Sequence, residues 1–458
     1  MPLFMNKILS TLLQTLSAYR QQPIVVAYSG GVDSQVLLHA LYTLQKQGDI
    51  TNAVRVCHVN HGLSDNANDW AEFASTQCQR LNLPLSVHRL SLEKISGESL
   101  EATARDARYQ VLISEYEHPA VILTGHHKDD QVETFFLALK RGSGLQGLSA
   151  MSTVSPLEHH FLLRPLLTIS RQEIEFYAQQ QQLSWVEDES NLDNQFDRNF
   201  LRNDVLPLLQ ERWPHIGDAI SRSADICRDN QKIVNDVALD DLQRVQGGAH
   251  SLKLAVLSQL SKARVFNVLR AFLTQHQVTM PSVAQLEQVY SQLASQEDKT
   301  PQVKVGEYWL RRYKNNVILT PSFDDVSGFK ESLSMDKLIN EGQAVVELPD
   351  NLGTLILKSV DGLTNENEHK TFFSVNKDTT LIITFEHSNP IIEPDYRDKS
   401  RALKKVLQEM NLPPWERKRL PFIMSEQSLV AVPSYFVCKP FNTDKNDLLF
   451  SVLWLDQE

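Results

Sequence analysis

Up to about residue 200, short apolar runs alternate with longer amphipathic stretches. The apolar runs predict β-strands, and helical periodicity fills the gaps between them. Strands separated by helices at this spacing are typical of βαβ units, which build a parallel, doubly wound α/β sheet. Ligands of such sheets bind beyond the carboxyl ends of the strands. The predicted strands lie at 24–28, 53–59, 85–90 and 120–125.

Two other parts of the chain have different patterns. Residues 1–20 predict an amphipathic helix rather than a signal peptide, because polar residues interrupt them and no cleavage site follows. After about residue 215, apolar residues recur three and four apart, and alternation at 302–320 predicts a hairpin with Asn315 and Asn316 at its turn. The predicted divisions are an α/β domain at 1–215, a helical middle domain at 216–320, a linking region of uncertain order at 321–370 and a small α+β domain at 371–458.

Composition limits the class of protein. A chain of 458 residues exceeds what one hydrophobic core normally serves, so several domains are expected. No apolar run approaches the roughly 20 residues of a membrane helix, and the four cysteines form no C-x-x-C pair, which favours a reducing cytoplasm over a disulfide framework or metal ribbon. The formal net charge of -11 is a sum, and local basic faces decide whether a nucleic acid binds.

The hexapeptide S-G-G-V-D-S at 29–34 follows the first predicted strand and opens a helix. It lacks the lysine of the G-x-x-x-x-G-K-[ST] phosphate loop. Gly30 and Gly31 allow a sharp turn close to a ligand, the start of the next helix suits an anion, and Asp33 can hold Mg²⁺ or position a nucleotide. A tight turn without a ligand is the alternative. The candidate nucleotide-binding residues here are Ser29, Gly30, Gly31, Val32, Asp33 and Ser34.

Polar residues also end the second strand and line the helix that follows the third. His58, Asn60 and His61 would face the nucleotide if the sheet is parallel, although histidines at strand ends are often structural. Arg105 and Arg108 lie three apart on one helical face, as ordinary surface arginines also do.

The stretch after the fourth strand carries two carboxylates at the start of a helix. Asp130 and Glu133 project from the same side, where they would bind a cation, Mg²⁺ or an amine. The neighbouring His126 and His127 suggest zinc only superficially, because adjacent histidines point in different directions.

Basic residues form further candidate contacts. Arg198 and Arg202 lie one helical turn apart and could hold a phosphate or a carboxylate. In the last domain, basic residues surround an aromatic ring on which a base could stack, although a run of charge is often only a solvated face. The candidate nucleic-acid contacts there are Lys404, Lys405, Trp415 and Arg417.

The hexapeptide resembles the pyrophosphate loop of the ATP pyrophosphatases. Its combination with five further motifs is similar to the tRNA(Ile)-lysidine synthetase family. These motifs are H-V-N-H-G-L, A-R-x-x-R-Y, H-H-x-D-D-Q-x-E-T, the D-x-S-N to R-N-x-x-R run, and K-K-x-L-x-E to P-x-W-x-R-x-x-x-P. The resemblance covers most of the chain except 321–370. It implies that ATP, with Mg²⁺, adenylates the C2 carbonyl oxygen of the wobble cytidine in a CAU-anticodon tRNA(Ile), and that the ε-amine of free L-lysine then displaces AMP.

On this resemblance the hexapeptide holds ATP and its pyrophosphate. Asp130 and Glu133 are expected to recognise lysine or act as its base, and Arg105 or Arg108 to neutralise a phosphate or the lysine carboxylate. The alternatives are a tRNA thiolase, an amidotransferase-type synthetase and a nucleotide-binding regulatory module. A tRNA thiolase would need a catalytic cysteine or C-x-x-C pair near the nucleotide site, and the cysteines of this sequence do not form one. An amidotransferase-type synthetase would need a glutaminase domain, and none is evident in this sequence. The sequence leaves a homodimer open.

Overall fold

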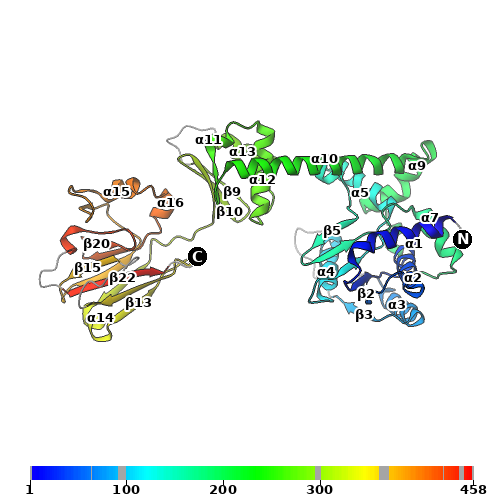
Figure 1. The fold of residues 1–458 in the computed structure, drawn as a ribbon, viewed down its shortest axis with the longest axis horizontal. Coiled ribbons are helices and arrows are strands. Elements are labelled where there is room, and N and C mark those ends of the chain that lie inside the picture. The colour runs from blue at the N-terminus through cyan, green and yellow to red at the C-terminus, as the bar shows by residue number, and fades with distance from the viewer. Residues whose placement is uncertain are drawn as a thin grey trace. The chain divides into compact units, whose positions relative to one another are not determined.

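The computed structural model describes residues 3–62, 64–90, 100–293, 301–360, 371–426, 428–442 and 448–455. The chain divides into two compact units, Met1–Val237 and Ala238–Glu458, and helix α10 (Ile216–Val245) crosses this boundary (Figure 1). In the described part of the chain, no helix is long and apolar enough to cross a membrane.

A six-stranded sheet forms the centre of the first unit. Its order is β3-β2-β1-β4-β6-β5, and all neighbours are parallel except β5, which runs antiparallel to β6. The predicted doubly wound sheet is therefore confirmed, with the first strand between the second and the fourth. The strands are β1 (Ile24–Ala27), β2 (Val54–Asn60), β3 (Leu85–Arg89), β4 (Val121–Leu123), β5 (Val154–Leu157) and β6 (His160–Leu163).

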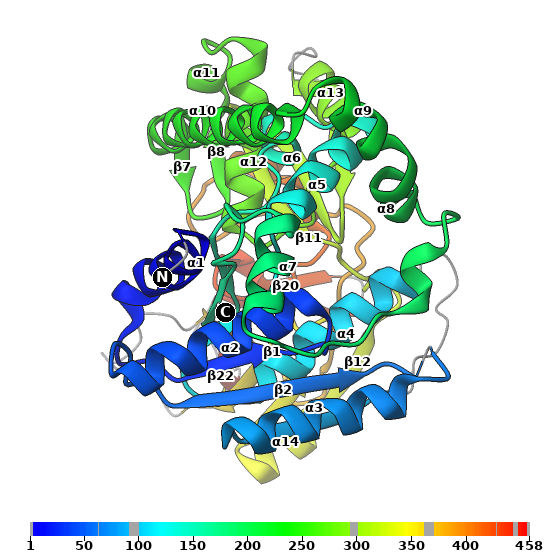
Figure 2. The same ribbon diagram turned by 90° about the vertical axis from the view of Figure 1, so that its right-hand side faces the viewer.

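Helices cover both faces of this sheet (Figure 2). Helices α1, α2, α3 and α7 pack on one face, and α4 packs on the other. The predicted first helix is confirmed as α1. The helices of the unit before α10 are α1 (Leu3–Leu16), η1 (Ser17–Tyr19), α2 (Val32–Gln47), α3 (Ala67–Leu81), α4 (Leu100–Ser114), α5 (Lys128–Lys140), α6 (Leu145–Leu148), α7 (Arg171–Gln180), η2 (Glu189–Leu192), α8 (Asp197–Phe200), the π-helix η3 (Leu201–Val205) and α9 (Leu206–Arg212).

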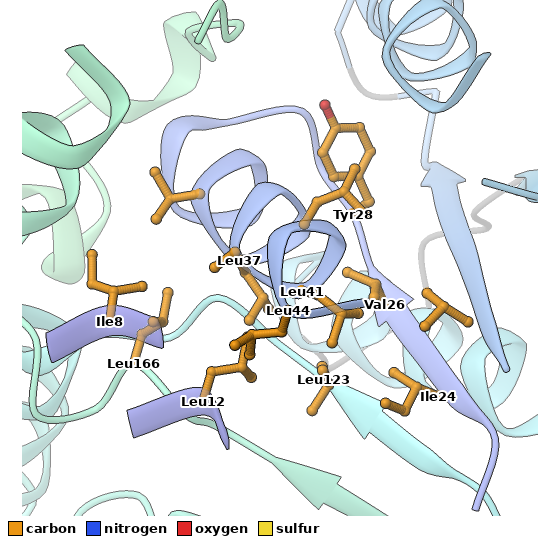
Figure 3. Close-up of a cluster of buried hydrophobic side chains, with 14 of the residues drawn as sticks. Ile8, Leu12, Ile24, Val26, Tyr28, Leu37, Leu41, Leu44, Leu123 and Leu166 are labelled. Atoms are coloured by element: carbon orange, nitrogen blue, oxygen red, sulfur yellow. The ribbon is translucent and has the colours of Figure 1, made fainter. Parts of the chain in front are cut away.

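The apolar face of α2 anchors the loop at its start. Figure 3 shows Leu37, Leu41 and Leu44 of this helix against Ile24 and Val26 of β1, and all five are at most 2% exposed. Spacings of four and three residues place the leucines on one stripe of the helix. Burying each such side chain is worth about 1.5–3 kcal/mol, so α2 is held firmly against β1.

The middle of the chain contains more strand than its helical pattern predicted. Beside its helices it forms an antiparallel sheet with the order β7-β8-β11-β10-β9. The hairpin at 302–320 is confirmed, but its turn is Lys314 and Asn315, because Lys314 has a positive φ of 51° and Asn316 already pairs with Tyr313. The elements are β7 (Gln246–Gly248), β8 (Ser251–Lys253), α11 (Leu254–Leu257), α12 (Lys262–Gln275), α13 (Val283–Leu293), β9 (Gln302–Val305), β10 (Tyr308–Tyr313) and β11 (Asn316–Pro321).

Residues 330–359 form regular elements, so the expected linking region is wrong for this stretch, while 361–370 lie outside the described residues. β12 pairs with β16, and β14 pairs with β22 near the end of the chain. The local pattern carried little sign of this because the partners are far apart in the chain. The elements are β12 (Lys330–Ser334), α14 (Met335–Glu341), β13 (Gln343–Glu347), β14 (Thr354–Ser359), β15 (Thr371–Val375), β16 (Thr380–Thr384), β17 (Ile391–Ile392), β18 (Arg401–Ala402), α15 (Leu403–Glu409), α16 (Pro414–Arg417), β19 (Phe422–Ser425), β20 (Ser428–Val432), β21 (Phe436–Val437), η4 (Lys439–Phe441) and β22 (Leu448–Leu455).

Candidate active site at the carboxyl ends of the parallel strands

The predicted phosphate loop forms the turn from β1 into α2. Gly30 has a positive φ of 89°, and Gly31 is the N-cap of α2. The Ser34 hydroxyl accepts the N–H of Gly30 at 3.1 Å and donates to the carbonyl oxygen of Gly31 at 2.9 Å, and its oxygen lies 3.1 Å from that of Ser29. The two serines thus fix the loop, and the N–H groups that open α2 lack partners within the helix and suit an anion.

Two close approaches require glycine around this loop. A Cβ on Gly30 would lie 2.9 Å from Cγ2 of Val186, whose N–H donates to the Gly30 carbonyl oxygen at 3.0 Å. A Cβ on Gly125, after β4, would lie 3.0 Å from the backbone nitrogen of Ser34. The loop is therefore enclosed by segments that follow β4 and α7 in the chain.

The N-termini of three helices meet beside the loop. Asp33 of α2 accepts from Nη1 of Arg171, the first residue of α7, at 2.8 and 3.0 Å. Nε2 of His127, the N-cap of α5, lies 3.6 Å from Asp33 and 3.5 Å from Asp130. Burial raises the pKa of Asp33, and the positive charges of His127 and Arg171 oppose that shift. A carboxylate, an imidazole and a guanidinium therefore share one site.

Sequence reasoning did not single out Arg171. Its only local signal is the capping box in which Ser170 and Glu173 exchange hydrogen bonds, and this marks a helix start, not a partner for Asp33. That partner could be found only once α7 was packed beside α2.

Asp130 and Glu133 lie together as their spacing predicted, and both contact Arg202. Nε of Arg202 donates to Glu133 Oε1 at 2.6 Å, and its Nη2 lies 3.0 Å from Glu133 Oε2 and from Asp130 Oδ1. Nε of Arg198 lies 3.3 Å from Glu133 Oε2. Two pairs that the sequence suggested separately therefore form one cluster, in which two arginines face two carboxylates.

The two carboxylates differ in exposure and in pKa. The Glu133 side chain is fully buried, whereas that of Asp130 is 13% exposed. Burial raises the pKa of Glu133, and its hydrogen bond with Arg202 opposes the shift. Burial acts on Asp130 too, but the charges of His127 and Arg202 hold the pKa of that carboxyl below its usual value. Asp130 is thus the more accessible of the two and the one whose charged form the surroundings favour.

Polar residues upstream hold the segment that carries the two arginines. Asp188 accepts the N–H of Ser190 at 2.9 Å, and Nδ2 of Asn199 donates to the carbonyl oxygens of Ser190 and Asp193 at 2.7 and 2.9 Å. Arg202 itself lies in the π-helix η3, a rare conformation that is frequent at functional sites.

His58 and His61 differ in their surroundings. Nδ1 of His58, which is buried, lies 2.9 Å from the carbonyl oxygen of Tyr28, so it ties the end of β2 to the end of β1. Nε of Arg108 donates to Nε2 of His61 at 3.2 Å. Burial and the Arg108 charge lower the pKa of His61 to about 4. His61 is therefore a neutral acceptor that positions Arg108.

Arg105 stacks on Tyr109, with its guanidinium carbon 5.4 Å from the ring centroid. Its charge also reaches the centre of the site. Burial lowers the pKa of His126 to about 4, and although Asp130 opposes this shift, the charges of Arg164, Arg105 and Arg198 add to it. Arg105 therefore belongs to the positive field around the carboxylate cluster.

The predicted tRNA contacts of the second unit lie on and beside two short helices. Lys404 and Lys405 are exposed at the start of α15, and Trp415 in α16 packs edge-on to Tyr313 with ring centroids 6.0 Å apart. Nε of Arg417 donates to the carbonyl oxygen of Leu412 at 2.6 Å. An open groove of about 1110 Å³ includes four basic residues in its lining, Lys330, Lys404, Arg417 and Lys418, beside three acidic ones, Asp325, Glu386 and Glu426.

Three family models match this chain. A PP-loop domain matches residues 5–209, a TilS substrate binding domain matches 252–318, and a TilS substrate C-terminal domain matches 381–454. Together they account for the α/β sheet, the middle strands and helices, and the last strands.

Relatives match over almost the whole length. A tRNA(Ile)-lysidine synthase of Serratia proteamaculans is 38% identical over 451 residues, which are 98% of this chain and 99% of that protein. One from Haemophilus influenzae is 38% identical over 440 residues, 94% of this chain and 98% of that protein. One from Vibrio cholerae is 36% identical over 439 residues, 96% of each.

Proposed function

This chain belongs to the tRNA(Ile)-lysidine synthase family and is an ATP-dependent ligase with that activity, and on this premise we propose the course of its reaction. The C2 carbonyl oxygen of the wobble cytidine in a CAU-anticodon tRNA(Ile) attacks the α-phosphorus of ATP, and pyrophosphate leaves. The ε-amine of free L-lysine then attacks C2, loses a proton, and AMP departs with the former carbonyl oxygen. Adenylation is needed because an amide-like oxygen is a poor leaving group.

The loop from Ser29 to Ser34 is our candidate for holding the pyrophosphate part of ATP. Its support is the positive φ of Gly30, the serine pair that fixes the turn, and the start of α2 beside it. Backbone N–H groups at a helix N-terminus suit an anion and would stabilise the charge on departing pyrophosphate.

Asp33 is our candidate ligand for Mg²⁺. Its carboxylate, with a side chain 26% exposed, stands in the first turn of α2. Mg²⁺ favours one or two carboxylates together with phosphate oxygens, and the bound ion would neutralise charge on the phosphates. Arg171 now pairs with both oxygens of Asp33, so we expect it to shift toward a phosphate when the ion binds.

Asp130 is our candidate for contact with lysine, and Glu133 is our candidate for positioning Arg202 beside it. An ammonium must be recognised and then deprotonated before it attacks. Asp130 is the more exposed carboxylate and has the lowered pKa, whereas Glu133 is fully buried against Arg202. Arg105, whose charge reaches this cluster, is preferred over Arg108 for a phosphate or the lysine carboxylate, because Arg108 is engaged with His61.

The groove of the second unit that Lys404 and Arg417 line is our candidate for part of the tRNA surface. Lys404 and Arg417 line it, and Lys405 is exposed beside it. Such a surface suits recognition of folded RNA by shape and phosphate charge. The location and the oligomeric state are separate points. The four cysteines are free and lie apart, which agrees with a reducing cytoplasm. The homodimer stays a prediction.

The observation that carries this proposal is the convergence of the glycine loop with the Asp130 cluster at one edge of the sheet. The test is incorporation of labelled lysine into tRNA(Ile), with AMP and pyrophosphate measured in the same reaction. We expect one AMP and one pyrophosphate for each lysine joined. A matched tRNA whose wobble base is uridine is the control and should accept no lysine.

Two variants divide the roles. Asp130→Asn should still adenylate tRNA but transfer lysine slowly, so that adenylated tRNA accumulates. Ser34→Ala should slow the adenylation step itself, because the loop loses the acceptor of the Gly30 N–H. Equal loss of both steps in Asp130→Asn would overturn its assignment to lysine.

A further inference from the structure

A second group of chemically active side chains lies near the β3 edge of the sheet in the first unit. The sulfur of Cys57 and one ligand atom each of His88 and Glu115 all lie within 4.8 Å of one another. In the described part of the chain, this is the group of three such residues close enough to share a metal ion, and His126 and His127 do not belong to it. The reaction proposed above uses none of the three.

The fold brings these residues together through strand register and the end of a helix. In the parallel pair of β2 and β3, Cys57 lies opposite Ser86, and His88 is two residues further along β3. Residues two apart on a strand point to the same face, so Ser86 and His88 share a side. Glu115 directly follows α4, which packs on that face of the sheet with Cys57 in the contact.

The Glu115 carboxylate is held through one oxygen and presents the other. Its Oε2 accepts from Oγ of Ser86 at 3.0 Å and from Nη1 of Arg55 at 3.4 Å. Its Oε1 lies 2.7 Å from Nε2 of His88. Hydrogen bonds that orient a ligating carboxylate from behind are a regular part of metal sites. The side chain of Glu115 is 3% exposed and that of His88 is 39% exposed, so the group opens to solvent on the histidine side.

We propose that Cys57, His88 and Glu115 bind one Zn²⁺ ion. Thiolate sulfur, imidazole nitrogen and carboxylate oxygen are the ligands that zinc takes in tetrahedral sites. The protein supplies three of them, and water on the open side of His88 supplies the fourth. The hydrogen bond between His88 and Glu115 gives way to two bonds to the ion.

The charges balance on binding. The Cys57 thiol gives up its proton to solvent, so a thiolate and a carboxylate, with neutral His88, neutralise the two positive charges of the ion. No oxidation or reduction is involved.

The ion would join three separate elements. Among the described strands, β3 lies at the edge of this sheet and pairs with β2 alone, and Glu115 adds the end of α4. A metal that binds the folded chain and not the unfolded one stabilises it in proportion to its affinity. The site therefore has a structural role, at a place the phosphate loop does not occupy.

Cobalt provides the direct test. The full-length chain, stripped of metal with a chelator, is titrated with Co²⁺ and followed by absorption. We expect a thiolate-to-cobalt charge-transfer band and the intense visible bands of tetrahedral Co²⁺, both saturating at one ion per chain. Zinc added afterwards should displace the cobalt and abolish both bands. A wild-type chain without the charge-transfer band would overturn the proposal.

Variants identify the ligands. His88→Asn and Glu115→Gln should lose the tetrahedral spectrum, and Cys57→Ser should lose the charge-transfer band. Cys78→Ser is the matched control, since Cys78 is equally buried in the same unit but outside the cluster, and it should bind cobalt as wild type does. Circular dichroism checks that each variant folds. His88→Asn changes a side chain that is partly exposed, so it tests the site even if Cys57→Ser misfolds.

The group behind the carboxylate gives a graded test. Ser86→Ala removes the 3.0 Å hydrogen bond to Glu115 and leaves all three ligands in place. We expect the zinc affinity to fall about 10-fold to 100-fold. Unchanged spectra in both His88→Asn and Glu115→Gln would mean that cobalt binds elsewhere, and the proposal would fail.

Discussion

The buried ion pair between Glu133 and Arg202 should show a larger coupling free energy than an exposed pair of the same length. The perturbation is a double-mutant cycle with Glu133→Gln, Arg202→Met and both together. Glutamine keeps the shape of Glu133 while removing its charge, and methionine keeps much of the length of Arg202. The cycle isolates the interaction between the two side chains from the cost of each change.

The structure sets the expected magnitude. Arg202 makes two hydrogen bonds to Glu133, at 2.6 and 3.0 Å, and the Glu133 side chain is fully buried. Removing one partner of a fully buried pair costs about 3–5 kcal/mol. The Arg202 side chain is 34% exposed and retains Asp130 as a partner, which lessens the cost, so we expect a coupling free energy of about 2 kcal/mol.

The same unit offers a matched control. Nζ of Lys140 lies 2.6 Å from Oδ2 of Asp197, the same separation as the shortest distance between Arg202 and Glu133, but both side chains are about 60% exposed. Pairs of this kind contribute about 0.2–1 kcal/mol. Both cycles are measured by urea denaturation, in which the free energy of unfolding of each variant is extrapolated to water. If the two coupling energies agree within about 0.5 kcal/mol, which is the usual additivity error, then burial does not set the strength of the Glu133 pair and the reasoning is refuted.

The phosphate loop, the residues that follow the second strand, and the lysines beside the groove of the second unit can each be tested by a substitution. Gly30→Ala should lose ATP binding and more stability than Gly48→Ala: both glycines have positive φ, at a cost of about 1–2 kcal/mol for alanine, but only the Cβ at Gly30 meets a neighbour. Denaturation and ATP titration measure the difference. His61 should titrate near pH 4 by NMR, whereas its pKa in the unfolded chain is 6.5. Between these two values the unfolded chain binds more protons, so the stability from this group is present above pH 6.5 and lost as the pH falls toward 4. The mutation His61→Gln should flatten that part of the plot of stability against pH. Reversing the charges of Lys404 and Lys405 should weaken tRNA binding and reduce its salt dependence. The slope of the logarithm of the binding constant against the logarithm of the salt concentration should fall by about 0.7–0.9 for each phosphate that the protein no longer neutralises. ATP affinity should not change, and an unaltered tRNA affinity would remove both lysines from the interface.

Much of the first unit was predictable because its determinants are local. The runs that form the central strands β1 and β4 are apolar throughout, as strands buried on both faces must be. Gly30 and Gly31 indicate a turn by residue type alone, and the spacing of Asp130 and Glu133 places them on one side of α5 whatever the rest of the chain does.

The later sheets were harder to predict because their strands pair across long distances. β12 and β14 are short, and their partners β16 and β22 follow after many intervening residues. The sequence of a half-exposed strand of this kind indicates little preference for β-structure, because that preference depends on packing against neighbouring strands. The turn predicted at Asn315 and Asn316 lies one residue earlier in the structure, at Lys314 and Asn315, for a related reason. Cross-strand pairing, not residue type, decides which residue takes the positive φ.

The sequence by itself determined that a parallel sheet carries a pyrophosphate-type loop, because a strand, two glycines and a helix start specify that turn through local backbone geometry. Only the tertiary structure decided which charges meet there. Arg171 reaches Asp33, and Arg202 joins Asp130 to Glu133, across separations of 138, 72 and 69 residues. Ion pairs of this kind depend on distance and burial in space, and neither quantity is written in the spacing of residues along the chain.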